Sequence, residues 1–282
     1  MLTLFGAITW NADPVIFQLG PLAVRWYGLM FAVGFLIGYA IMSRMFRHEG
    51  APERWLGILL VYLGIGTIVG ARLGHVFFYE WDVYSQDPIR ILYIWEGGLA
   101  SHGGTIACII AICLFSWFTA KKSPLWTLDR VCIPTALVGA LIRIGNLFNS
   151  EIYGHHTDLP WGFIFVRRGE VLPSHPTQLY EALSYLALFG LLMWMYWKRN
   201  SEKRPGLLFG VFLTVLFTAR FLIEFVKNVQ VDFEQNMTLN MGQWLSIPFI
   251  VVGIGLIIYA IKRPCLHLEF PNKFPDDPKR KK

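Results

Sequence analysis

The chain has 282 residues, of which 55% are hydrophobic, 16% aromatic and only 16% charged, and its formal net charge is +6. A soluble domain carries about 25% charged residues, so this composition excludes an ordinary soluble globular protein. The apolar residues are gathered in long runs, and these runs determine the predicted fold.

Seven continuous apolar runs follow one another, each near the roughly 20 residues that cross the hydrocarbon core of a bilayer. In chain order they cover about residues 20–43, 56–78, 91–118, 128–148, 179–197, 206–226 and 243–262. Because the runs do not alternate, and because backbone polar groups in lipid must be satisfied within their own segment, helices are predicted. The expected fold class is an all-α polytopic membrane protein with about seven transmembrane helices. We expect a single integral membrane domain over residues 1–282, with an outer-surface cap at about 149–178.

Lysine and arginine cluster after the first, third, fifth and seventh runs, and the last cluster includes the tail from Lys273 to Lys282. Fewer basic residues lie on the opposite side, namely Arg90, Arg167, Arg168 and Lys227. The positive-inside rule therefore predicts an outer N-terminus and a cytoplasmic C-terminus. The net charge reflects this topology and gives no reason to expect a nucleic-acid partner. Residues 1–20 lack a basic start and are not expected to be a cleaved signal peptide.

Four cysteines are present, at Cys108, Cys113, Cys132 and Cys265. None has CxxC or paired-ligand spacing, and three lie within apolar runs, where cysteine is commonly a small buried apolar residue. Neither a metal site nor a disulfide is expected.

Polar residues inside the apolar runs are the main functional signal. An arginine in a membrane span costs at least about 2.5–3.5 kcal/mol on insertion scales. On a helix, Gly139, Arg143, Asn146 and Ser150 share one narrow arc. Gly139 would admit a neighbouring element, and Asn146 would hold the guanidinium or a ligand oxygen. The alternative is an arginine that extends to the interface, although such a residue needs no amide beside it.

Arg220 and Glu224 are one helical turn apart and are compatible with a buried ion pair. Such a pair either joins helices or steadies a guanidinium that binds phosphate through two parallel hydrogen bonds. Arg72 and His75 have similar spacing, but helix packing is the favoured reading for them.

The segment "EGGLASHGGTIA" combines four glycines with His102. Glycine disfavours a helix by about 1 kcal/mol, so a break is predicted here, and the helix that resumes would present free N–H groups to an anion. His102 at this break is a candidate for chemistry, although glycines also serve helix packing and a lone histidine is often structural.

Two further segments contain candidate residues. Tyr27 lies near the outer end of the first run, where an aromatic belt residue is also expected. In "SHPTQLYEAL", Pro176 fits a first helical turn and His175 is a candidate cap. Arginines, amides and a histidine in the outer half of the bundle together indicate a membrane-embedded site for a phospholipid or similar phosphate.

These motifs also resemble those of a known family. Four motifs resemble those of bacterial phosphatidylglycerol–prolipoprotein diacylglyceryl transferases and follow one another in the same order. In chain order they are "HGGT" (102–105), "RIGNLFNSEIYG" (143–154), "HPTQLYE" (175–181) and "RFLIE" (220–224). The chain is similar to this family over essentially its whole length, although Leu216 stands where many members have tyrosine.

The resemblance implies a multi-pass enzyme of the bacterial cytoplasmic (inner) membrane. It would transfer the diacylglyceryl group of phosphatidylglycerol, a membrane lipid, to the lipobox cysteine of a prolipoprotein signal peptide, without a cofactor. The implied catalytic residues are His102, Arg143 and Arg220, with His102 as the base unless the arginines alone lower the thiol pKa. The implied head-group contacts are Tyr27, Arg143, Asn146, Glu151, Gly154 and Glu224. A phospholipid transporter or an assembly factor without transferase chemistry is the alternative.

Overall fold

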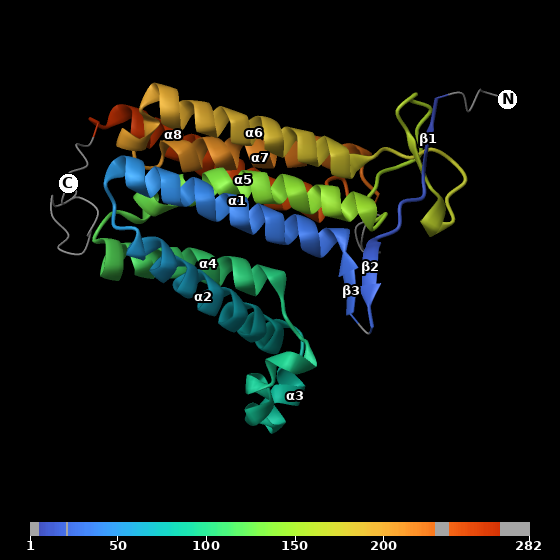
Figure 1. Ribbon diagram of the computed structural model, residues 1–282, viewed down its shortest axis with the longest axis horizontal. Coiled ribbons are helices and arrows are strands. Elements are labelled where there is room, and N and C mark those ends of the chain that lie inside the picture. Colours follow the sequence, from blue (N-terminus) through green and yellow to red (C-terminus); the bar gives the residue numbers. More distant parts are fainter. Residues whose placement is uncertain (1–5, 21, 229–236, 266–282) are drawn as a thin grey trace. The chain divides into compact units, whose positions relative to one another are not determined.

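The computed structural model describes residues 6–20, 22–228 and 237–265 and is predominantly helical (Figure 1). Within these ranges, 7 helical segments are long and apolar enough to cross a membrane. They are α1 (Trp26–Glu49), α2 (Arg54–Phe78), α4 with the following π-helical turn (His102–Ala120), α5 (Pro124–Phe148), α6 (Thr177–Arg199), α7 with the following 3-10 turn (Leu207–Val226) and α8 (Met241–Lys262). The predicted fold class is confirmed. The basic tail from Lys273 lies outside the described residues.

Two of the predicted spans begin too early. Residues 20–25 were assigned to the first run, but they contain the strand β3 (Leu22–Arg25), which forms a hairpin with the preceding β2 (Val15–Leu19). Helix α1 begins only at Trp26 and continues to Glu49. Gly20 turns the hairpin at φ 57°, a backbone conformation that favours glycine. The prediction was wrong here because the short apolar strand merges with the helix in composition.

The third span was predicted from residue 91, but α4 begins only at Ser101. Before it lie α3 (Trp81–Gln86) and two 3-10 turns, η1 (Pro88–Leu92) and η2 (Ile94–Glu96). Gly97 and Gly98 follow with φ of 89° and 73°, which ends helical geometry at this point. The predicted break is therefore present, and it lies before the span rather than within it.

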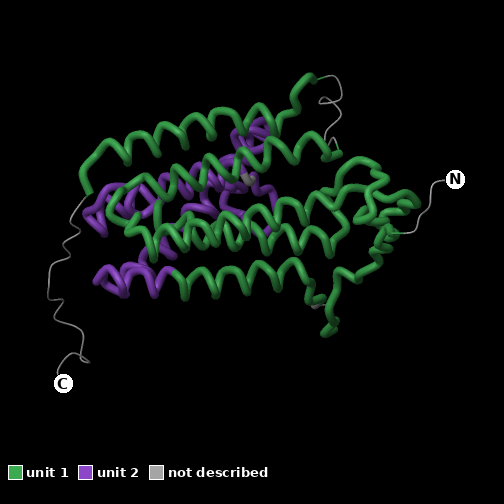
Figure 2. The backbone as a smooth tube through the Cα atoms, turned by 90° about the horizontal axis from the view of Figure 1, so that it is seen from above, with its two compact units in different colours: residues 1–41, 129–266 green, residues 42–128, 267–282 purple. Residues whose placement is uncertain are grey.

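The chain divides into two compact units (Figure 2). Unit 1 comprises residues 1–41 and 129–266, and unit 2 comprises residues 42–128 and 267–282. The expectation of one membrane domain with a cap stays a prediction.

Asp129 and a glycine contact anchor the helices of unit 1 to one another. The Asp129 carboxylate accepts hydrogen bonds from the backbone N–H groups of Gly206 (2.7 Å) and Phe209 (2.8 Å), and so caps the start of α7 from α5. Further along, a Cβ at Gly210 would lie 2.9 Å from the carbonyl oxygen of Gly253, which shows how closely α7 and α8 pack.

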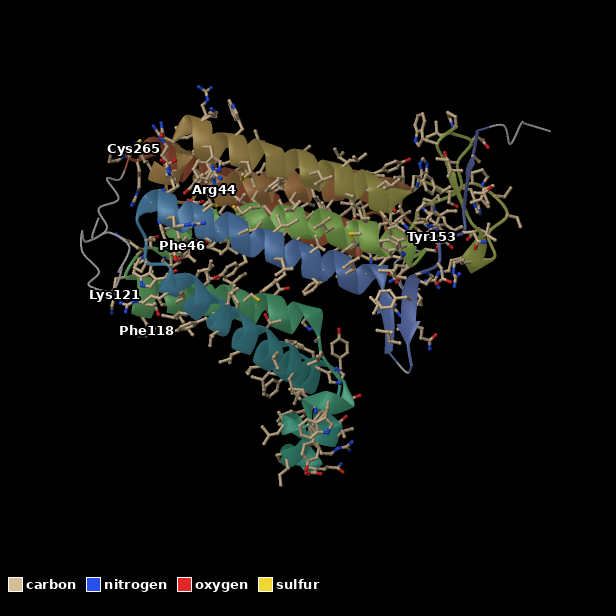
Figure 3. All side chains as sticks on the ribbon, viewed as in Figure 1. Arg44, Phe46, Phe118, Lys121, Tyr153 and Cys265 are labelled. Carbon is tan, nitrogen blue, oxygen red and sulfur yellow. The ribbon has the colours of Figure 1, made fainter. Side chains whose placement is uncertain are left out.

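One end of unit 1 carries a small folded cap. Strand β1 (Ile8–Trp10) pairs in parallel with β4 (Phe163–Phe165), and the Trp10 indole donates a 2.9 Å hydrogen bond to the carbonyl of Leu147 at the end of α5. Tyr153 marks this end, whereas Cys265 marks the opposite end (Figure 3).

Basic residues gather at the Cys265 end of unit 1, where α6 ends, α7 begins and α8 ends. They are Lys198, Arg199, Arg204, Lys262 and Arg263. In unit 2, Arg44 and Lys121 likewise share one end (Figure 3). This distribution is what the positive-inside rule requires, and the orientation itself stays a prediction.

In unit 2, α2 and α4 pack together through small residues. A Cβ at Gly70 would lie 2.7 Å from the carbonyl oxygen of Gly103 and would overlap the methyl group of Ala107. One turn further, Gly74 meets the Cα of Gly103, where an added Cβ would be 2.8 Å away. Gly103 therefore serves helix packing and not the helix break.

Arg72 of α2 holds the segment before α4 in place. The guanidinium donates to the backbone carbonyls of Arg90 (2.5 Å), Ile91 (2.9 Å), Tyr93 (3.2 Å), Gly97 (2.5 Å) and Gly98 (3.3 Å). The residue is only 3% exposed. Because its donors are occupied by backbone, Arg72 is structural, as the packing interpretation favoured.

Replacing Arg72 with lysine is expected to destabilise unit 2, because one ammonium group cannot reach carbonyls that the planar fork reaches from three nitrogens. Each hydrogen bond to a charged group is worth about 1.5–3 kcal/mol, so the melting temperature in detergent should fall by roughly 5 °C or more. The control is Arg47→Lys, since that side chain is 63% exposed and pairs with exposed Glu53. Equal shifts for both variants would contradict the structural role of Arg72.

Candidate functional site

Arg143 of α5 contacts α6 and its own helix. Its side chain is 16% exposed, its Nε forms an ion pair with Oε2 of fully buried Glu181, and its Nη1 donates to Oδ1 of Asn146 at 3.1 Å. Tyr185 of α6 packs on Gly139 and also hydrogen-bonds Arg143. The predicted helical arc is confirmed for Gly139, Arg143 and Asn146, but Ser150 lies beyond the end of α5 at Phe148 and has φ of 53°. The Arg143 guanidinium is held by protein partners, which the alternative of an arginine that extends to the interface did not require.

Glu151 positions Arg143 indirectly, through an amide. Its Oε1 accepts hydrogen bonds from Asn146 Nδ2 (2.7 Å) and from Asn149 Nδ2 (3.1 Å). Asn146, in turn, faces the guanidinium through its carbonyl oxygen, so the carboxylate fixes which way the amide points. Gln178 of α6 donates to the Glu151 backbone carbonyl at 2.6 Å and ties this turn to the neighbouring helix.

The turn after α5 is unusual in its backbone. Ser150 and Ile152 have φ of 53° and 63°, and the N–H of Glu151 returns to the carbonyl of Asn146 at 3.1 Å. Positive φ is rare for a β-branched residue, and Thr177 holds the strained position by donating 2.7 Å to the Ile152 carbonyl. This backbone directs the Glu151 side chain back towards the amides of α5.

Three buried charges extend the network from Arg143. The Lys227 ammonium lies 3.5 Å from Oε1 of Glu181 and 3.5 Å from Oε2 of Glu224. The exposed fractions of these side chains are 2% for Lys227, 0% for Glu181 and 8% for Glu224. We name Arg143, Glu181, Lys227 and Glu224 the ionic chain.

Arg220 of α7 belongs to unit 1, as does Arg143. The charges of both guanidiniums act on the Tyr185 hydroxyl. Among residues 6–20, 22–228 and 237–265, Arg220 forms no ion pair. The anticipated Arg220–Glu224 ion pair is absent among the described residues. The Glu224 N–H donates to the Arg220 carbonyl, so the two residues keep helical spacing, and the Glu224 carboxylate pairs with Lys227 instead.

His102 lies in unit 2, at the second residue of α4, and is exposed. Its ring contacts Phe78 (centroids 5.4 Å apart) and Tyr79 (5.7 Å), both near the end of α2. The aromatic contacts fix the position of the imidazole and leave one side of it open. Arg143 and Arg220 belong to unit 1.

Tyr27 and Gly154 both lie in unit 1, and each is at a point where two segments of the chain pack closely. A Cβ at Gly145 would lie 2.9 Å from the Tyr27 ring, so α1 and α5 approach closely here. At Gly154 a Cβ would overlap the carbonyl oxygen of Val226, and Gly154 bridges to Lys227. The φ of Gly154 is not positive, so glycine is not required here for a left-handed backbone. It is needed because two backbones meet.

His175 was a candidate cap for α6, but it does not cap this helix. Pro176 is the N-cap residue and there is no side-chain cap bond. The His175 ring instead contacts the Tyr180 hydroxyl at 3.1 Å, and the Trp161 indole donates to that hydroxyl at 3.0 Å. Nearby, burial and a 2.7 Å hydrogen bond to Glu170 raise the pKa of Tyr153 to about 12, so this phenol stays protonated.

A family model described as prolipoprotein diacylglyceryl transferase matches residues 14–259. The chain belongs to this family. A relative from Porphyromonas gingivalis is 52% identical over 277 residues, which cover 93% of this chain and 98% of the relative. Another, from Tolumonas auensis, is 52% identical over 253 residues, covering 90% and 97%. Both are named phosphatidylglycerol–prolipoprotein diacylglyceryl transferase. The resemblance inferred from the motifs is confirmed.

Sequence reasoning missed two members of the ionic chain of this diacylglyceryl transferase family member. Glu181 closes the quoted motif "HPTQLYE" and shares a helix face with Gln178 and Tyr185, three and four residues away. That spacing is readable in the sequence. Lys227 was counted only as a flanking basic residue, and nothing in its local pattern indicates that it is buried.

The cap of this diacylglyceryl transferase family member should lose stability in acid through His175. Burial lowers the pKa of His175, and the charge of His155 lowers it further. As the pH falls below about 6.5, His175 is therefore protonated more readily in the unfolded chain than in the folded chain. The free energy of unfolding decreases as a result. We expect His175→Gln to flatten the decline of the melting temperature between pH 7.5 and 5.5, with His48→Gln as the control. An unchanged slope for His175→Gln would argue against this assignment.

Proposed function

We propose that this chain transfers the diacylglyceryl group of phosphatidylglycerol to the lipobox cysteine of prolipoproteins in the bacterial cytoplasmic membrane. The names of the full-length relatives support this activity. The structural observation that carries it is that Arg143 and Arg220 of unit 1 both act on the Tyr185 hydroxyl, with no ion pair for Arg220 among the described residues. A half-buried guanidinium in an apolar span needs an anion, and lipid phosphate is the anion available there.

The reaction requires a thiolate and a stabilised leaving group. The cysteine S–H bond breaks, sulfur forms a thioether bond to the glyceryl carbon, and the bond from that carbon to the phosphate oxygen breaks. Glycerol phosphate leaves with the bonding electrons. A phosphodiester thereby becomes a phosphate monoester, so negative charge increases on its oxygens during the step. No redox change and no cofactor are involved.

Arg143 and Arg220 supply the matching positive charge. A guanidinium can meet two phosphate oxygens with parallel N–H donors, and an interaction that strengthens as charge develops accelerates the reaction. Asn146 holds Arg143 directly, and Glu151 holds Asn146. Tyr27, Gly154 and Glu224 complete the proposed head-group region.

His102 accepts the thiol proton in this proposal. A free thiol has a pKa near 8.5 and reacts as the thiolate, and an exposed imidazole is a suitable base at neutral pH. The transfer is tested with purified protein, phosphatidylglycerol vesicles and a lipobox peptide, by weighing the peptide. Absence of the diacylglyceryl mass would favour a phospholipid transporter or assembly factor instead.

Replacing Arg220 with lysine is expected to lower the transfer rate by about 10²-fold or more, because charge is kept but the two-pronged contact is lost. The matched control is Arg199→Lys, since Arg199 lies over the Trp194 ring at the far end of α6. The measurement is peptide mass gain against time at saturating peptide. A rate within twofold of wild type would remove Arg220 from phosphate binding.

Replacing His102 with glutamine is expected to lower the rate by about 10²–10⁴-fold near neutral pH, the usual contribution of a general base. The loss should shrink as the pH rises towards the thiol pKa, since hydroxide then makes thiolate without the imidazole. A pH–rate profile of wild type and variant measures this. His48→Gln is the matched control, and identical profiles for His102→Gln and wild type would exclude His102 as the base.

A further inference from the structure

We propose that Glu181 and Lys227 are positioning residues, which hold Arg143 in place before lipid binds and release its charge to the phosphate afterwards. The inference rests on the proposed function and deepens it. It begins from the order of charges along the ionic chain, which alternates from Arg143 to Glu181, Lys227 and Glu224.

Glu181 cannot be left alone when Arg143 binds a phosphate. Its side chain is fully buried, and an unpaired carboxylate in that environment costs several kcal/mol. Arg143 is one of its two cationic partners and Lys227 is the other. A phosphate that takes up the positive charge of Arg143 therefore requires Lys227 to neutralise Glu181.

Lys227 is placed to make that exchange. Its ammonium lies 3.5 Å from both carboxylates, beyond the 2.7–2.9 Å of a strong charge-assisted hydrogen bond. A small movement shortens one contact and lengthens the other. Lysine suits this role, because an ammonium on a flexible stem bonds in any direction, whereas a guanidinium is confined to its plane.

Glu224 tolerates the movement because it has a second source of stabilisation. Its carboxylate lies against Gly242, where an added Cβ would be 2.7 Å from the carboxyl carbon. Gly242 is in the first turn of α8, after the N-cap Asn240. The positive end of the helix stabilises a carboxylate at this position, so Lys227 can move towards Glu181.

The backbone around Lys227 joins all the signature segments of unit 1. The backbone of Lys227 forms an isolated antiparallel β-bridge with Gly154. The Gly154 N–H donates to the His175 carbonyl at 2.9 Å. The segments 143–154, 175–181 and 220–224 thus meet at the ionic chain, which explains why a buried lysine stands just beyond the third of them.

The test is a cycle of variants read by phosphatidylglycerol binding in nanodiscs without peptide, and by KM and kcat for transfer. Lys227→Met leaves Glu181 to retain Arg143, so binding should weaken about 10-fold with kcat less affected. Glu181→Gln should lower kcat while binding is kept. In the Glu181→Gln background, adding Lys227→Met should change binding by less than about twofold, since there is no carboxylate left to neutralise.

The competing outcomes are distinct. An equal loss from Lys227→Met in both backgrounds would mean that Lys227 contacts the lipid directly, and would overturn the proposal. Wild-type binding by Lys227→Met would also overturn it. If that variant does not fold, the pair Glu181→Gln and Glu181→Gln/Lys227→Met still decides, and melting temperatures identify general destabilisation. Absence of peptide transfer by wild type, with phosphatidylglycerol binding and the variant coupling intact, would instead reject the proposed function alone.

Discussion

Burying guanidinium groups in an apolar helical bundle is the constraint on which this structure depends. An isolated charge in such surroundings is costly, so the partners of each guanidinium decide what it can do. Arg72 is surrounded by carbonyl oxygens, Arg143 is held by a carboxylate and an amide, and Arg220 forms no ion pair within the described part of the chain. The three arginines are similar in sequence context, and their partners give them different roles.

Small residues allow these partners to reach one another. Gly139 admits Tyr185, Gly145 admits Tyr27, and Gly154 admits the backbone at Val226. Each contact brings a neighbouring element against α5 or the turn that follows it. Because α5 is approached on several sides, the polar groups at its end are enclosed by protein rather than lipid, which is what makes their hydrogen bonds effective.

Much of the helical fold could be predicted, because a membrane span needs about 20 apolar residues and little else. The bounds failed where apolar composition does not distinguish strand from helix, as at residues 20–25. Within the site, Asn146 was predictable because its partner is one turn away on the same helix. Lys227 was not, because its burial depends on Glu181 of α6, which lies 46 residues away in the sequence.

The roles of Glu224 and Arg220 follow from the partners that surround Glu224. Glu224 stands one helical turn from Arg220, since its N–H donates to the Arg220 carbonyl. Its carboxylate nevertheless lies against Gly242 and 3.5 Å from the Lys227 ammonium, and it forms no ion pair with Arg220. The guanidinium of Arg220 is thereby left for an external anion, and the carboxylate that would have competed for it keeps Lys227 available to Glu181. The position of one carboxylate thus separates the role of Arg220, which binds the anion, from the role of Lys227, which neutralises the carboxylates.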